Sequence, residues 1–133
     1  MKYMLDTNIC IYIIKKKPKI VFDRMEQALK DGLAISAITL AELEHGVFLS
    51  NYPEKNTIAL NKFLSILEIL SFDGEAAFHY GNIHADLQQK GTIIGQMDML
   101  IAAHARSRGM IVVTNNTREF ERVEGLGIEN WVS

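Results

Sequence analysis

The sequence lacks several features that mark whole classes of protein. Its 133 residues include one cysteine, so an intramolecular disulfide framework is excluded. The longest apolar runs, Ile9–Ile14 and Met110–Val113, fall far short of the roughly 18 residues that a membrane-spanning helix needs. The first residues place a charge directly after a short apolar run and show no secretory signal pattern. These absences favour a soluble protein, for which we expect a cytoplasmic location.

An excess of positive charge is also missing, because the formal net charge is −2 at pH 7. General phosphate binders usually carry a clearly basic face, so this charge argues against bulk attraction to nucleic acid. It does not exclude a nuclease, since clustered carboxylates subtract charges that bound cations would restore. Two basic groups remain, which are either solvated helix ends or a contact surface: Lys15, Lys16, Lys17 and Lys19, and Arg106, Arg108, Arg118 and Arg122.

The composition is that of an ordinary globular protein, with 48% hydrophobic and 23% charged residues. The length fits one compact domain, so we predict a single domain over residues 1–133. No internal repeat, low-complexity segment or linker is evident. Cys10 lies in an apolar run and is interpreted as a core residue. The four histidines show no metal-ligand spacing and are interpreted as surface or core residues.

Short apolar segments alternate with amphipathic helical segments along the chain. Strands are predicted at Lys2–Leu5, Leu33–Ala37, Leu67–Phe72 and Met110–Thr114, with a final edge strand within Leu126–Val132. Helices are predicted from Asn8 to the lysine-rich end, over Ile20–Lys30, Leu40–Leu49, Glu54–Ile66 and Asp73–Lys90, and from Asp98 to a stop at Gly109. This alternation predicts an α/β fold in three layers, with a mostly parallel central sheet covered by helices on both faces.

Three acids stand near predicted strand ends and helix starts. Asp6 follows the first strand, Glu42 is expected in the first turn of the helix after the second strand, and Asp98 begins the helix before the fourth strand. In open parallel sheets the ligand site lies beyond the carboxyl ends of the strands, so all three could converge there. Oxygen ligands of this kind suit Mg²⁺ or Mn²⁺, and such ions can drive phosphodiester hydrolysis.

Each acid also has an ordinary structural explanation. Asp6 could cap the helix that starts near Asn8. Thr39 and Glu42 have the spacing of a capping box, in which the Glu side chain reaches back to the Thr amide. Asp98 could complement the positive end of its helix. Taken singly, these explanations are the better ones, and only the combination of acids favours a site.

Four blocks of sequence carry a resemblance to a known family. They are Met4-Leu5-Asp6-Thr7-Asn8, Ser36 to Leu43 with Gly46, Gly95 to Ala105, and Val113 to Phe120. These blocks occur in the same order as in VapC toxins and span essentially the whole chain, which therefore resembles that family. The resemblance implies a PIN-like fold, dependence on Mg²⁺ or Mn²⁺, endonucleolytic cleavage of RNA, and neutralisation by a cognate VapB-like antitoxin.

The resemblance also implies roles for individual residues. Asp6 and Asp98 would be the main metal ligands and Glu42 the third acid. Many PIN domains have a fourth acid where this chain has Asn116, so Asn116 would orient the attacking water or Glu119 would supply the missing carboxylate. We further expect Thr114 to support the site through its hydroxyl group, or merely to end a strand. Arg118 would contact an RNA phosphate, or pair with an acid in its own loop.

The predicted reaction is in-line attack of water on a backbone phosphorus, which expels the 3′ oxygen and leaves a 5′ phosphate. Similarity to the enteric type of VapC, strongest at Asn8–Tyr12 and Thr114–Val123, implies initiator tRNA cut in its anticodon loop. The antitoxin would lay a helix in a groove lined by Ile11, Ile14 and the Leu40–Phe48 face, and send an Arg or similar group into the acids. The resemblance also implies a homodimer and a toxin-antitoxin hetero-oligomer.

Two other function classes compete with a ribonuclease. A non-catalytic binding module would use the acid pocket to capture a basic residue of a partner. A phospho-acceptor or phosphohydrolase would use a strand-end Asp as its nucleophile. Against the latter, Asp6-Thr7-Asn8 has no second Asp two residues on, and the chain has no Gly-rich phosphate loop.

Overall fold

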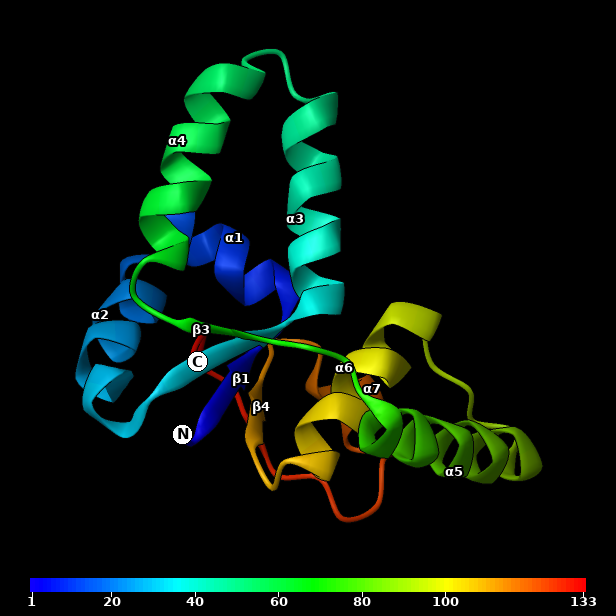
Figure 1. Cartoon of the computed structure of the whole chain (residues 1–133). Coiled ribbons are helices and arrows are strands. Elements are labelled where there is room, and N and C mark those ends of the chain that lie inside the picture. Colours follow the sequence, from blue (N-terminus) through cyan, green and yellow to red (C-terminus); the bar gives the residue numbers. More distant parts are fainter.

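Five short parallel strands form the centre of the molecule (Figure 1). The computed structural model describes residues 1–133, and its strands are β1 (Tyr3–Leu5), β2 (Leu33–Ser36), β3 (Glu68–Leu70), β4 (Ile111–Val113) and β5 (Ile128–Glu129). They lie in the order β3-β2-β1-β4-β5, and every neighbouring pair is parallel. Met4 in the central strand lies opposite Ala34 and Val112. The carboxyl ends of all strands therefore share one edge of the sheet.

Helices cover both faces of this sheet. They are α1 (Thr7–Lys15), α2 (Lys19–Ala28), α3 (Ala37–Leu49), α4 (Pro53–Leu64), α5 (Gly74–Lys90), α6 (Gln96–Ser107) and α7 (Thr117–Phe120), with a 3₁₀ turn, η1, at Leu29–Asp31. In Figure 1, α1, α2 and α4 lie on one side of the strands, and α5, α6 and α7 lie on the other. The predicted three-layer α/β fold is thus confirmed, with a sheet that is entirely parallel.

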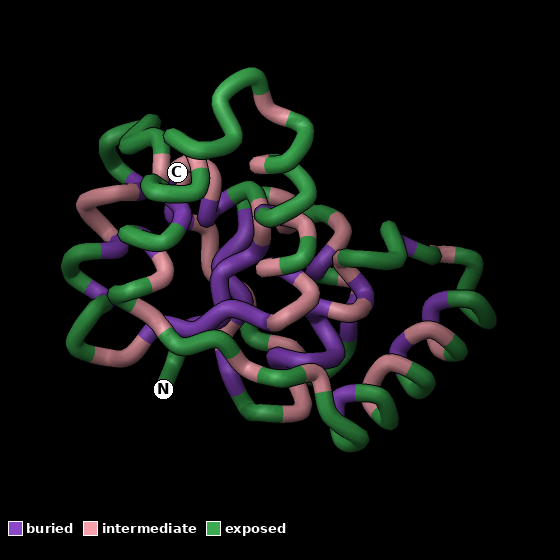
Figure 2. The backbone as a smooth tube through the Cα atoms, turned by 45° about the horizontal axis from the view of Figure 1, so that its top comes forward, coloured by how far each residue is buried: buried purple, intermediate pink, exposed green.

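Two apolar cores follow from the alternation of side chains along the strands. Tyr3 and Leu5 of β1 pack with α1, α2 and α4, whereas Met4 between them packs with α5, α6 and α7. Figure 2 shows the buried backbone concentrated in the strands at the centre. Burial of apolar surface on both faces explains why the three inner strands, β2, β1 and β4, are short apolar runs without polar alternation.

The helices α3 and α4 form a hairpin that projects from the sheet (Figure 1). Phe48 and Leu49 at the end of α3 and Tyr52 before α4 are strongly exposed. Only the half of α3 nearest the sheet is anchored in the core, where Thr39 and Leu43 are buried. The hairpin consequently leaves apolar surface open to contact with other molecules.

The main differences from the predicted elements concern α3, the final strand and the segment after β4. The helix α3 begins at Ala37 and not at Leu40, because the Ser36 hydroxyl accepts the Ile38 amide and caps the helix earlier. The final strand has two residues, since the chain leaves the sheet to bury Trp131 edge-on against the Tyr3 ring. The polar segment after β4 contains a short helix, α7, that the sequence pattern did not predict. No helix has both the length and the apolar character required to cross a membrane.

Candidate active site

Asp6 is held rigidly at the carboxyl end of the central strand. It is the N-cap of α1, where its Oδ1 accepts a hydrogen bond of 2.9 Å from the Ile9 amide. Its own amide donates to the Val113 carbonyl of the adjacent strand at 3.0 Å. Only 4% of the residue is exposed. Asp6 can therefore both cap α1 and take part in the site, because only one of its carboxylate oxygens is used by the cap.

Glu42 lies in the second turn of α3 and not, as predicted, in the first. The predicted capping box is wrong, because the helix is capped by Ser36 and the buried Thr39 hydroxyl has no hydrogen-bond partner. Glu42 instead accepts a hydrogen bond from the hydroxyl of Thr7, at the start of α1. This contact draws the Glu42 carboxylate toward the end of β1, where Asp6 lies. Thr7 was missed from sequence, and its position directly after Asp6 was the available signal.

Asp98 lies in the first turn of α6 and is joined to the segment after β4 by one amide. The Asn116 Nδ2 donates to Asp98 Oδ2 at 3.1 Å and to Glu119 Oε2 at 2.9 Å. Thr114 is fully buried, and its Oγ1 accepts the Asn116 backbone amide at 2.8 Å. The structure therefore brings both Asn116 and Glu119 to Asp98, rather than one of them alone.

Burial and neighbouring negative charge both raise the pKa values of Asp6 and Asp98. Burial is the largest cause that raises the pKa of Asp6, the charge of Glu42 also raises it, and the Thr114 side chain and the Ile9 amide lower it. Burial and then the charge of Asp6 raise the pKa of Asp98 to about 6, with Glu119 contributing further. The Asn116 hydrogen bond acts in the opposite direction on Asp98. Four carboxylates are thus linked electrostatically, and a cation would relieve their repulsion.

The donor set suits a hard cation that keeps much of its water. No three His, Cys, Asp or Glu side chains are arranged so that they alone would hold a metal ion. This disfavours a closed zinc-type site, which needs about four protein ligands. Mg²⁺ is usually bound through one or two carboxylates together with waters and substrate phosphate. Asp6 and Asp98 fit that description, with Glu42 and Glu119 close enough to add charge.

Two cationic residues lie in α7 or just after it, close in sequence to Glu119. Arg118 in α7 is exposed and makes no ion pair, so the predicted pairing within its own loop is not present. The sequence did not indicate a role for Arg122 in the site. In the structure its guanidinium donates to the Ile93 carbonyl at 3.2 Å, in the loop that leads into α6. Arg122 therefore supports the segment that carries Asp98, while Arg118 is free to contact an anion.

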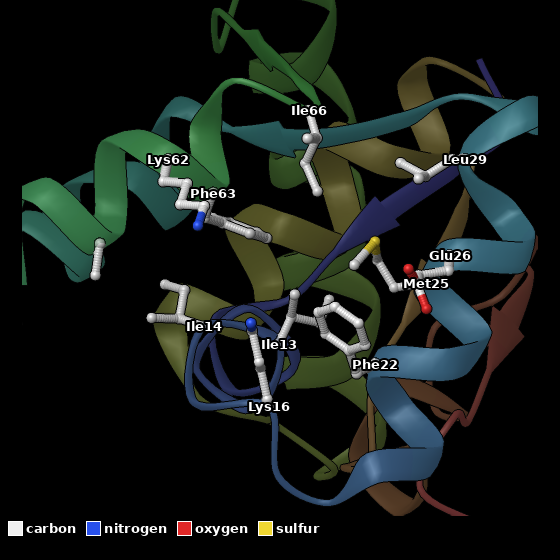
Figure 3. Close-up of a pocket in the computed structure, with 11 residues that line it drawn as sticks. Ile13, Ile14, Lys16, Phe22, Met25, Glu26, Leu29, Lys62, Phe63 and Ile66 are labelled. Atoms are coloured by element: carbon white, nitrogen blue, oxygen red, sulfur yellow. The ribbon is translucent and has the colours of Figure 1, made fainter.

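Two apolar hollows flank α1. One, of about 340 Å³, lies between α1, α3 and α4; it includes Ile11, Ile14 and Val47, as predicted, and reaches Glu42, whereas Phe48 does not line it. The other, of about 430 Å³, was not predicted and lies between α1, α2 and α4. Figure 3 shows Phe22, Met25 and Phe63 around it, with the amines of Lys16 and Lys62 nearby. Ile14 and Ala59 line both hollows, so the two hollows are neighbours on either side of these residues.

Comparison with known proteins places the chain in a family. A family model described as PIN domain matches residues 3–126. Over 132 residues the chain is 51% identical to "Ribonuclease VapC2" of Haemophilus influenzae, with 99% of each chain covered. The chain belongs to the VapC-type ribonuclease toxins of the PIN-domain family.

Other VapC relatives extend this comparison. The chain is 50% identical to the "tRNA(fMet)-specific endonuclease VapC" of Shigella flexneri, with 98% of each chain covered. Its fold superimposes with a TM-score of 0.93 on a chain of VapBC2 from Rickettsia felis bound to a promoter DNA fragment, at 46% identity over 98% of this chain and 99% of that one. DNA-bound VapBC from Salmonella typhimurium gives the same TM-score at 49% identity, with 98% of each chain covered.

Proposed function

We propose that this VapC-type toxin hydrolyses RNA phosphodiester bonds with Mg²⁺ or Mn²⁺ held chiefly by Asp6 and Asp98. The observation that carries this proposal is the gathering of four carboxylates, those of Asp6, Glu42, Asp98 and Glu119, at the carboxyl end of the sheet, where Thr7 and Asn116 hold three of them by hydrogen bonds. A divalent cation bound there would polarise the phosphate and activate water. Burial of Asp6 and its anchoring by two backbone contacts fix one ligand before any cation arrives.

The remaining residues take supporting roles in this proposal. Glu42, oriented by Thr7, and Glu119, oriented by Asn116, would bind the waters that surround the cation. Asn116 would also direct the attacking water without adding charge, because its amide can both donate and accept. Thr114 would hold Asn116 through the backbone contact described above. Arg118 would neutralise part of the RNA phosphate charge.

The substrate we propose is tRNA, cut within a single-stranded loop such as the anticodon loop of the initiator. The name of the Shigella flexneri relative, a tRNA(fMet)-specific endonuclease, supports this choice. The net charge of −2 also fits a narrow substrate, since it provides no bulk attraction to every RNA. A loop exposes unstacked bases and accessible phosphates to a recessed acid cluster.

The partner we propose is a VapB-like antitoxin that occupies the two hollows beside α1. The similar structures from Rickettsia felis and Salmonella typhimurium are VapBC complexes, which supports this choice of partner. An apolar helix would fill the hollow around Phe22 and Phe63, and the chain would continue past Ile14 toward Glu42, where a basic side chain would enter the acids. Homodimerisation, expected from the family, stays a prediction.

Cleavage of a total tRNA pool by the purified protein tests the ribonuclease proposal. Asp6→Asn should abolish cleavage in Mg²⁺ or Mn²⁺, because Asn keeps the helix cap but removes the metal-binding charge. Asp23→Asn, on the distant helix α2, is the matched control and should cleave like the wild type. Discrete products that need the metal and vanish only in Asp6→Asn would support the proposal. Equal products from both variants would refute it, and no products from the wild type would favour a non-catalytic binding module.

A further inference from the structure

A buried polar pair joins the two helices that carry Glu42 and Asp98. Ser36 Oγ and His104 Nδ1 lie 2.7 Å apart, and both residues are fully buried. Ser36 ends β2 and caps α3, while His104 lies in the last turn of α6. It is the only hydrogen bond of the structure between α3 with its cap and α6.

The direction of this hydrogen bond follows from counting donors and acceptors. Ser36 Oγ already accepts the Ile38 amide at 3.1 Å, so its own proton is free to be donated to His104 Nδ1. The opposite arrangement would leave both the Ser36 proton and the Nε2 lone pair buried without partners. His104 is therefore the neutral imidazole with its proton on Nε2. Burial, and then the charge of Arg108, lower the pKa of His104, which agrees with a neutral ring.

Packing alone does not account for a histidine at this place. Its buried Nε2 makes no hydrogen bond of good geometry, and the nearby Ser71 backbone raises the pKa of His104 only as a minor cause. Burial of this polar atom is therefore unfavourable, whereas a phenylalanine ring would fill the space without that cost. The ring packs edge-on against Phe72, with the ring centroids 5.4 Å apart, a contact that any aromatic ring could make. What phenylalanine could not provide is the acceptor for Ser36. The directional hydrogen bond is therefore the property that distinguishes His104.

We propose that Ser36 and His104 form a positioning pair that fixes α3 relative to α6, and with them the spacing between Glu42 and Asp98. This inference rests on the proposed roles of those acids in metal binding. Ser36 acts at the root of α3, so a small shift there is carried along the helix to Glu42. An apolar contact resists such sliding weakly, whereas a buried hydrogen bond has a defined length and direction.

Substitution of His104 tests the pair through Mn²⁺ binding measured without RNA, by titration calorimetry or electron paramagnetic resonance. His104→Phe keeps the ring but removes the acceptor, and should weaken Mn²⁺ binding about tenfold, as loss of residues that orient metal ligands typically does. His104→Asn places an amide oxygen where Nδ1 lies and should restore most of the affinity. In cleavage assays, His104→Phe should lower kcat with little change in KM.

Further variants separate the possible outcomes. Ser36→Ala should weaken Mn²⁺ binding as much as His104→Phe does. The double variant should bind Mn²⁺ no more weakly than Ser36→Ala alone, because both changes remove the same hydrogen bond. If His104→Phe does not fold, the Ser36→Ala variant still tests the pair. Unchanged Mn²⁺ affinity in His104→Phe, or equal losses in His104→Phe and His104→Asn, would overturn the positioning pair. Wild-type Mn²⁺ affinity in Asp6→Asn would instead refute the proposed metal site itself.

Discussion

Asn116 occupies the place where many PIN domains have an acid, and the structure gives that amide a definite task. Its Nδ2 bridges Asp98 and Glu119, so one neutral group satisfies two carboxylates that repel each other. An aspartate there would have added a further negative charge to a cluster of four. The amide lets the acids stay close together before a cation binds, which favours a preorganised site.

Asp98 should make both metal binding and metal-free stability depend on pH. Its pKa in the folded protein is raised from 3.8 to about 6, so folding favours its protonated form. Its contribution to stability is therefore fully present below about pH 3.8, falls as the pH rises, and is lost above about pH 6. Mn²⁺ must displace the proton of Asp98 in order to bind. The affinity of the protein for Mn²⁺ should therefore rise about tenfold per pH unit up to about pH 6 and then level off.

Thermal unfolding without metal and Mn²⁺ titration, each at about pH 5 and about pH 7, measure the two effects. Asp98→Asn is the reference for stability, because its amide does not titrate. The stability of Asp98→Asn relative to the wild type should increase between these pH values. A difference that is independent of pH would show that Asp98 titrates at its ordinary value.

Among the elements, α3 was predicted from the sequence as a helix, but its first residue was predicted wrongly. Ser36 and Thr39 are both residues that cap helices well, and Thr39 has the Glu three positions later that favours a capping box. The choice between them depends on tertiary contacts. Ser36 is fixed by His104, and Glu42 is drawn away by Thr7 from a different helix. Neither partner is local in sequence, so the pattern could not reveal the earlier start of the helix.

The cap of α1 yields a stability prediction that is separate from catalysis. Asp6 Oδ1 accepts the Ile9 amide, and Asn can make the same contact whereas Ala cannot. Both Asp6→Asn and Asp6→Ala should lose cleavage. Asp6→Ala should be about 1 kcal/mol less stable than Asp6→Asn in urea unfolding, which is the typical cost of a lost N-cap. Equal stability of the two variants would mean that the carboxylate does not cap the helix in solution.

Across the whole molecule, most strands and helices could be predicted in their order along the chain. The strands β1, β2 and β4 are apolar runs that are largely buried, and the longer helices have recognisable start and stop signals. The convergence of Asp6, Glu42 and Asp98 followed from the parallel sheet, since its strand ends share one edge. The larger hollow beside α1 could not be predicted. It depends on how far α2 and α4 stand apart, which brings Phe22 and Phe63 to opposite sides of one space. No local pattern encodes that separation.

The two hollows should make inhibition by antitoxin separable from catalysis. Ile14 lines both of them and belongs to none of the contacts among the acids, so Ile14→Lys should place a charge in the path of the antitoxin helix without disturbing the acid cluster. We expect Ile14→Lys to bind the cognate antitoxin at least about tenfold more weakly and to keep cleaving tRNA in its presence. Ile20→Lys, on the exposed side of α2 and outside both hollows, is the matched control and should stay fully inhibited. Full inhibition of Ile14→Lys would place the antitoxin on another surface, such as the exposed end of the α3–α4 hairpin. If Ile14→Lys fails to cleave tRNA even without antitoxin, α1 also takes part in holding the acids.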